Sequence, residues 1–101
     1  MNSEIHQLEN RIDQLSLDIL GPLRLSKALN FPALRELEGH LDRLGILLGS
    51  ANEVPRVLTG KLWILFCSML AEAEHATEPD EILNAAWAVQ EKLRRIYSAT
   101  S

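Results

Sequence analysis

The sequence predicts an all-α protein, a four-helix bundle that carries a short extra helix between its first and second helices and forms a dimer. Three observations support this prediction. Apolar residues recur at alternating steps of three and four in four long segments. Aromatic residues make up only 5% of the chain, so aliphatic side chains must fill the core. Glycine and proline fall between the segments, where they end helices.

Length and charge set the broad class of the protein. Residues 1–101 are expected to form a single helical domain, because this length supports one hydrophobic core. Acidic residues outnumber basic ones by 14 to 10, which gives a formal net charge of −4. Nucleic acids and anionic membrane surfaces both favour basic proteins. We therefore expect a second copy of the chain and another protein as partners, with no nucleic acid and no membrane. We also expect no cofactor.

The N-terminus and the most apolar run both favour a cytoplasmic location. The first ten residues, MNSEIHQLEN, contain neither the basic nor the apolar segment of a secretory signal. The run LWILFCSMLA, residues 62–71, lies between Lys61 and Glu72 and has about half the length of a membrane-spanning helix. Protein rather than lipid is therefore expected to cover this run.

The first helix is expected over residues 3–20, with an apolar seam at heptad spacing. Gly21 and Pro22 should end it, because proline lacks an amide donor and glycine supplies a flexible joint. Residues 22–30 then form a predicted short helix that stops at Asn30. The residues expected to face inward are Ile5, Leu8, Ile12, Leu15 and Ile19 in the first helix and Leu25, Ala28 and Leu29 in the short one.

The remaining long helices are expected over residues 32–48, 54–76 and 79–97. Gly49 stops the second helix, and Pro55 fits the first turn of the third. The third and fourth helices are joined by only a few residues, which predicts an antiparallel hairpin. The inward stripes are Leu34, Leu37, Leu41, Leu44 and Leu48 in the second helix and Ile82, Ala86, Val89, Leu93 and Ile96 in the fourth.

The third helix is apolar on two sides. One side is an ordinary core stripe, and the opposite side also carries apolar or small residues at three- and four-residue spacing. The core stripe is Leu58, Leu62, Leu65, Phe66, Met69, Leu70 and Ala73. The opposite side is Val57, Gly60, Ile64, Cys67, Ser68 and Ala71.

A helix that is apolar all round is expected to be buried. Either residues 22–30 or a second copy of the chain could cover the outer side, and the sequence leaves both possible. We favour a homodimer, in which the same surface meets its own copy. Cys67 is expected to be a buried small hydrophobic residue rather than a reactive thiol.

The fourth helix carries a second candidate surface. Trp87 lies off the inward stripe, beside Leu83 and Arg94, and tryptophan and arginine are typical interface anchors. This group is a candidate partner-binding site. The alternative is that Trp87 and Trp63 cover the edge of the core, with their ring N–H groups in water.

Catalytic and metal-binding patterns are weak. Glu72 and His75 have the Glu-x-x-His spacing of helical metal sites, but such sites need further carboxylates and a second copy of the motif. Glu36 and His40 form a second possible pair. A metal-dependent helical enzyme or carrier that uses the acidic and histidine cluster at residues 72–81 is therefore kept as an alternative. No catalytic constellation is visible, so we expect a non-enzymatic protein.

The segment LSKALNFPALRELEGHL, residues 25–41, resembles the helix-turn-helix of small DNA-binding repressors. The resemblance implies a regulator that binds DNA through its second helix. Pro32 crowds the turn, and the second helix carries three acidic residues against two arginines, which fits DNA poorly. The preferred hypothesis is a small acidic accessory, inhibitor or immunity-type protein that binds another protein and acts as a homodimer.

Overall fold

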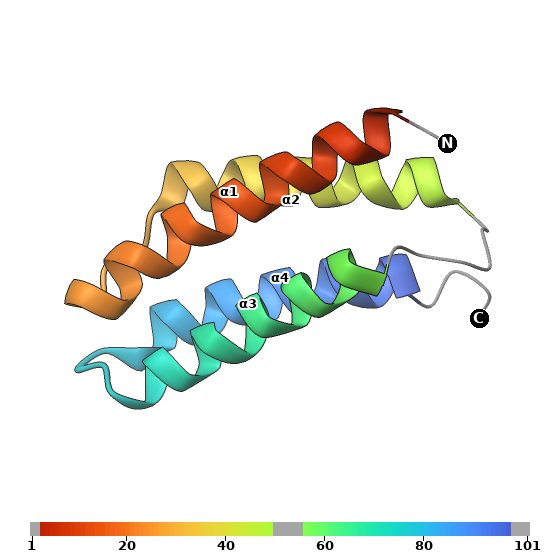
Figure 1. Ribbon diagram of the computed structural model, residues 1–101. Coiled ribbons are helices and arrows are strands. Elements are labelled where there is room, and N and C mark those ends of the chain that lie inside the picture. Colours follow the sequence, from red (N-terminus) through yellow and green to blue (C-terminus); the bar gives the residue numbers. More distant parts are fainter. Residues whose placement is uncertain (1–2, 50–55, 98–101) are drawn as a thin grey trace.

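The computed structural model describes residues 3–49 and 56–97, which form four α-helices and no strand (Figure 1). The predicted all-α architecture with four long helices is confirmed. The expected start of the third helix at Val54, with Pro55, lies outside the described residues. The helices are α1 (Ser3–Ser26), α2 (Phe31–Leu48), α3 (Arg56–Glu74) and α4 (Pro79–Tyr97).

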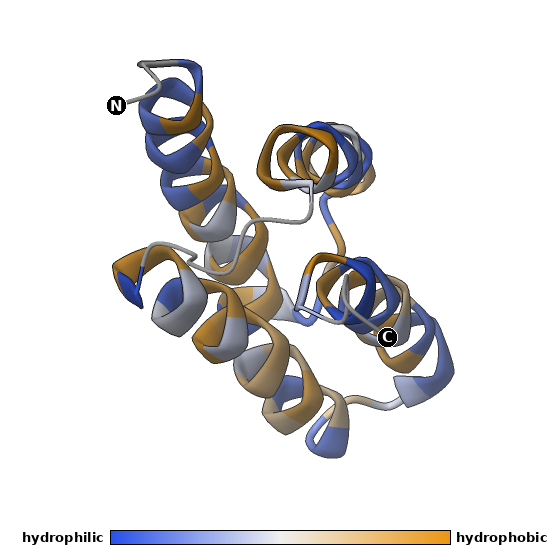
Figure 2. Ribbon diagram, turned by 90° about the vertical axis from the view of Figure 1, so that its right-hand side faces the viewer, coloured by the Kyte–Doolittle hydropathy of each residue, from blue (hydrophilic) through white to orange (hydrophobic). Residues whose placement is uncertain are grey.

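The bundle consists of two antiparallel hairpins, α1–α2 and α3–α4, that lie one against the other (Figure 1). Helix α1 packs against α3, and α2 packs against α4. The helices of each of these two pairs run in the same direction. Seen along the bundle, the four helices occupy the corners of a square (Figure 2). Helices α2 and α3 are consecutive in the chain but stand at opposite corners and are not packed together.

The core lies between the two hairpins and contains the predicted apolar stripes. Ile5 and Leu70 are partly buried, and the other residues of the four long-helix stripes are buried. Helical spacing alone therefore identified most of the core, because each helix buries one side in a bundle of this kind.

The predicted short helix between the first and second helices is wrong. Helix α1 continues through Gly21 and Pro22 to Ser26, and Leu23 is fully buried. A proline inside a helix leaves the carbonyl four residues earlier without its usual amide donor. In this protein that carbonyl belongs to Asp18, and the side-chain amide of Asn30 donates a hydrogen bond to it at 3.3 Å.

Two of the three residues expected to face inward from the short helix do not. Leu25 is almost fully exposed and Ala28 is exposed, while Leu29 is partly buried against the core. The reason is that residues 22–26 follow the rotation of α1, which turns Leu23 rather than Leu25 toward the core.

Asn30 begins α2 rather than ending a helix. Its side-chain oxygen accepts a hydrogen bond from the amide of Ala33 at 3.2 Å, which is an N-cap. Lys27 adopts the left-handed conformation, with φ of 56°, and its amide bonds to the Leu23 carbonyl at 3.0 Å. This left-handed residue closes α1 in place of the glycine usually found there. A four-residue turn, residues 27–30, therefore reverses the chain.

Bidentate ion pairs hold α1 against α2. Arg11 donates to both carboxylate oxygens of Glu36, at 2.5 and 2.8 Å, and Arg43 donates to Glu4 in the same way. His40 also contacts Glu36, at 3.0 Å. The hydrogen bonds from Arg11, and then from His40, lower the pKa of Glu36 from 4.5 to about 2.

We predict that Asn30→Ala destabilises the fold by about 1–2 kcal/mol, because the substitution removes the N-cap of α2 and the donor to the Asp18 carbonyl. Asn30→Asp keeps the capping oxygen and loses only the donor, so its effect should be smaller. Urea unfolding followed by circular dichroism measures both. Asn10→Ala, at an exposed position inside α1, is the matched control and should not destabilise. Equal effects at positions 10 and 30 would show that Asn30 has no special role.

We predict that Glu36 contributes to stability above its ordinary pKa of 4.5 and that this contribution is lost as the pH falls toward 2. The sign follows from the direction of the shift, because a carboxyl whose pKa is lowered by folding binds protons less readily in the folded state. The urea midpoint of the wild type should therefore fall through this window, and Glu36→Gln should flatten the fall. Glu38→Gln, on the same helix, should retain the wild-type pH profile.

Candidate functional site

The outer side of α3 is exposed and apolar. Val57 and Ile64 are 64% and 63% exposed, and the other residues are small and carry no charge. In Figure 2, hydrophobic and neutral colours predominate along α3, whereas hydrophilic stretches are frequent in α1. We call this surface the outer row. It consists of Val57, Gly60, Ile64, Cys67 and Ala71, which are exposed, and Ser68, which is partly buried.

Residues 22–30 do not cover the outer row, since they complete α1 and form the turn to α2. Cys67 is accordingly exposed in the single chain, not buried as the sequence predicted. A side chain at Gly60 would meet nothing within 4 Å, so the packing of this chain does not require glycine there. The described part of the chain therefore leaves this side of α3 open.

Helix α1 extends the exposed apolar surface. Asp13 of α1 pairs with Lys61 of α3 at 3.1 Å, which shows how the two parallel helices are aligned. About one turn further along each helix come Leu17, which is 68% exposed, and Ile64. Sequence reasoning missed Leu17, because its position beside α3 depends on this alignment.

An aromatic cluster connects α3 with α4. The ring centroids of Trp63 and Phe66 are 5.8 Å apart, and the angle between the two ring planes is 76°. For Phe66 and Trp87 the centroid distance is 5.6 Å and the interplanar angle is 59°. Phe66 is buried, while Trp63 and Trp87 are 41% and 53% exposed. The tryptophans thus pack against the edge of the core and also present large apolar surfaces to solvent. The role of Trp87 in partner binding stays a prediction.

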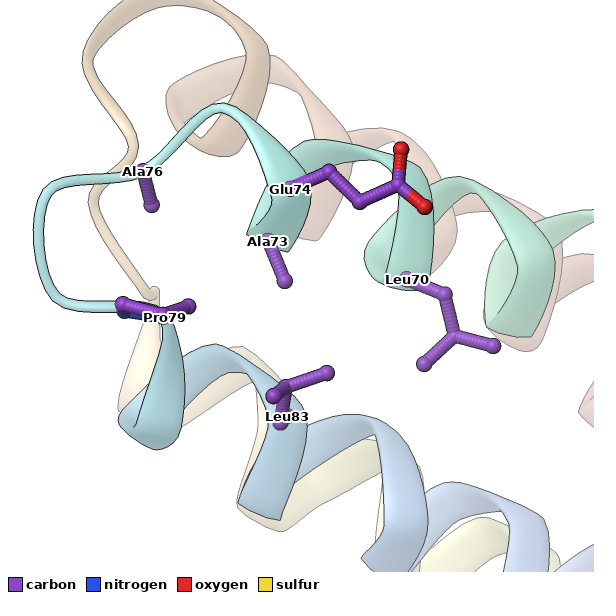
Figure 3. Close-up of a pocket in the computed structure, with 6 residues that line it drawn as sticks. All are labelled: Leu70, Ala73, Glu74, Ala76, Pro79 and Leu83. Carbon is purple, nitrogen blue, oxygen red and sulfur yellow. The ribbon is translucent and has the colours of Figure 1, made fainter.

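The three candidate residues on α4 have different environments. Leu83 is partly buried and lines a hollow of about 420 Å³ between the ends of α3 and α4 (Figure 3). Trp87 lies one turn further along. Arg94 is exposed but donates to both oxygens of Glu91, at 3.0 and 2.7 Å. Leu83 and Trp87 therefore belong to one apolar surface, whereas Arg94 takes part in an ion pair at its far end.

Two of the proposed metal ligands, Glu72 and Glu36, are held by basic side chains. Lys27 donates to Glu72 at 2.5 Å, and this hydrogen bond lowers the pKa of the Glu72 carboxyl. His75 follows the end of α3, and Glu36 is held by Arg11 as well as by His40. Among the described residues, no three histidine, cysteine, aspartate or glutamate side chains are grouped closely enough to hold a metal ion.

Residues 25–41, which resemble a helix-turn-helix, cover the last residues of α1, the turn and the first part of α2. The two helices lie antiparallel and are joined by ion pairs along their length, whereas the helices of that motif cross at a steep angle. No helix within 3–49 or 56–97 has both the length and the apolar character needed to cross a membrane.

Comparisons of this chain with protein-family models, with curated proteins and with solved structures found no match.

Proposed function

We propose that the protein is a non-enzymatic protein-interaction module that acts as a homodimer, with the outer row of α3 as the seam. The supporting observation is the row itself, an uncharged apolar helix face that the described part of the chain leaves uncovered. Soluble monomers rarely expose large contiguous apolar surfaces, and those that do often use them for binding.

The shape of the row suits contact with its own copy. An isologous dimer brings the same residues together around a twofold axis, and the centre of the row lies near Ile64 and Cys67. Small residues at Gly60, Cys67 and Ala71 allow two helices to approach closely. An antiparallel pairing of the two α3 helices also places opposite ends of their dipoles together, which is favourable.

Burial of the larger side chains supplies the driving force. Complete burial of a valine or isoleucine side chain is worth about 1.5–3 kcal/mol, and Val57, Ile64 and Leu17 are each exposed by more than half. Two copies of each residue would leave water in a symmetric dimer. The alternative of a metal-dependent enzyme or carrier has less support, because Lys27 already neutralises Glu72.

We predict a dimer in sedimentation equilibrium at micromolar concentration. Ile64→Glu should yield a folded monomer, because it places a charge at the centre of the seam without touching the core. Ile46→Glu is the matched control, since Ile46 is 69% exposed on α2, away from α3, and this variant should remain dimeric. A wild-type monomer at high micromolar concentration would disprove the dimer.

We also predict that the dimer protects Cys67 from thiol reagents. The chain has a single cysteine, so the reaction of a thiol reagent with the folded protein reports on this position alone. The thiol should react slowly in the wild type and rapidly in the monomeric Ile64→Glu variant, in which the outer row is open. The Ile46→Glu variant should react as slowly as the wild type. Equal rates in all three proteins would place the seam elsewhere.

A further inference from the structure

A second apolar surface lies in the groove between α3 and α4, beside the outer row. At one end of the groove is the hollow lined by Leu70, Ala73, Glu74, Ala76, Pro79 and Leu83. Figure 3 shows Leu70 and Leu83 projecting from their two helices into the space between them, with small residues behind and the Glu74 carboxylate pointing outward. The floor of the hollow is therefore apolar and its rim is acidic.

The aromatic cluster continues the groove along both helices. Phe66 lies one turn from Leu70 on α3, and Trp87 lies one turn from Leu83 on α4, so the buried phenylalanine and the exposed tryptophan extend the apolar floor. From Pro79 to Trp87 the groove is about 12 Å long, at 1.5 Å per helical residue. This length matches two apolar anchors spaced i and i+7 on a bound helix, the usual pattern of helix-in-groove recognition.

Charge decides what kind of helix fits. Glu74 is on the rim of the hollow, and Asp80 precedes Trp87 by two turns on the same side of α4. Neither carboxylate forms an ion pair with another described residue, whereas Lys27 is held by Glu72 and Lys61 by Asp13. Arg94, at the opposite end of the groove, is held by Glu91. The end of the groove with the hollow therefore presents uncompensated negative charge.

We propose that this groove binds a basic amphipathic helix of a partner protein. One apolar anchor enters the hollow beside Leu83, the other packs on Trp87, and lysine or arginine side chains face Glu74 and Asp80. The inference rests on the proposed role as a protein-interaction module but does not depend on the dimer. A second copy of this acidic chain is a poorer occupant, because it would add negative charge to an acidic rim.

The test uses two fluorescent peptides of about 14 residues, long enough to span the groove as a helix. Both carry leucine at the same amphipathic positions, with lysine at all other positions in one and glutamate in the other. Fluorescence anisotropy should show the lysine peptide binding to the full chain at least about tenfold more tightly than the glutamate peptide. Equal binding of the two peptides would overturn the proposal.

Matched variants separate the groove from general attraction to an acidic protein. Glu74→Gln with Asp80→Asn should weaken binding of the lysine peptide about tenfold, whereas Glu38→Gln with Asp18→Asn makes the same charge change outside the groove and should have little effect.

Trp87→Ala should also weaken binding of the lysine peptide. Phe31→Ala, which removes another exposed aromatic ring, should leave this binding unchanged. If a groove variant and its matched control lose the same affinity for the lysine peptide, the groove is not the binding site.

The monomeric Ile64→Glu variant distinguishes this proposal from the dimer proposal. It should bind the lysine peptide as well as the wild type does, because Ile64 lies outside the groove. If the wild type is a monomer and still binds the peptide in the groove, the dimer proposal fails and the groove proposal stands. A different result would overturn the groove proposal. If the wild-type dimer does not bind the lysine peptide and Trp87→Ala dissociates that dimer, a second copy of the chain occupies the groove.

Discussion

The joint between the first two helices depends on the side chain of Asn30. Its amide group donates to the Asp18 carbonyl, which Pro22 leaves without a helical donor, and its oxygen caps the start of α2. These two hydrogen bonds allow α1 to run past a proline and still reverse direction within a few residues. The ion pairs at Arg11 and Arg43 can form only because this reversal lays α2 along α1. Asn30 thus links the end of α1 to the start of α2.

The arrangement of the two hairpins determines which surfaces remain open. Each helix in the square contacts two neighbours and keeps one side toward solvent. In α1, α2 and α4 much of that side is charged, whereas in α3 it is the outer row. The edge between α3 and α4 adds the aromatic cluster and the hollow at Leu83. The candidate surfaces are therefore contiguous and all involve α3. Substitutions on different sides of this helix can distinguish the role of the outer row from that of the groove between α3 and α4.

The periodic part of the fold was predictable from sequence, and the relations between helices were not. The stripes from Leu34 to Leu48 and from Ile82 to Ile96 are buried as expected, because a helix pattern is a local property of the chain. The end of α1 was predicted wrongly, since the proline rule takes no account of a donor that arrives from Asn30. Most of the outer row is exposed in the single chain, and its role as a dimer seam stays a prediction. Cys67, which was expected to be buried, is exposed in the single chain. Leu17 and the hollow beside Leu83 could not be foreseen, because both depend on the alignment of two helices.

The separation of α2 from α3 has a consequence for folding kinetics. Consecutive helices that do not pack together divide the chain into two local units, each closed by its own short turn. Contacts within a hairpin join residues that are near in sequence and require little loop-closure entropy, so we expect them to form early. The contacts of α1 with α3 and of α2 with α4 join distant residues, and we expect them to complete the core last. Changes in the turn at Asn30 should therefore alter the folding rate differently from changes at the Asp13–Lys61 contact, which reports on the docking of the two halves.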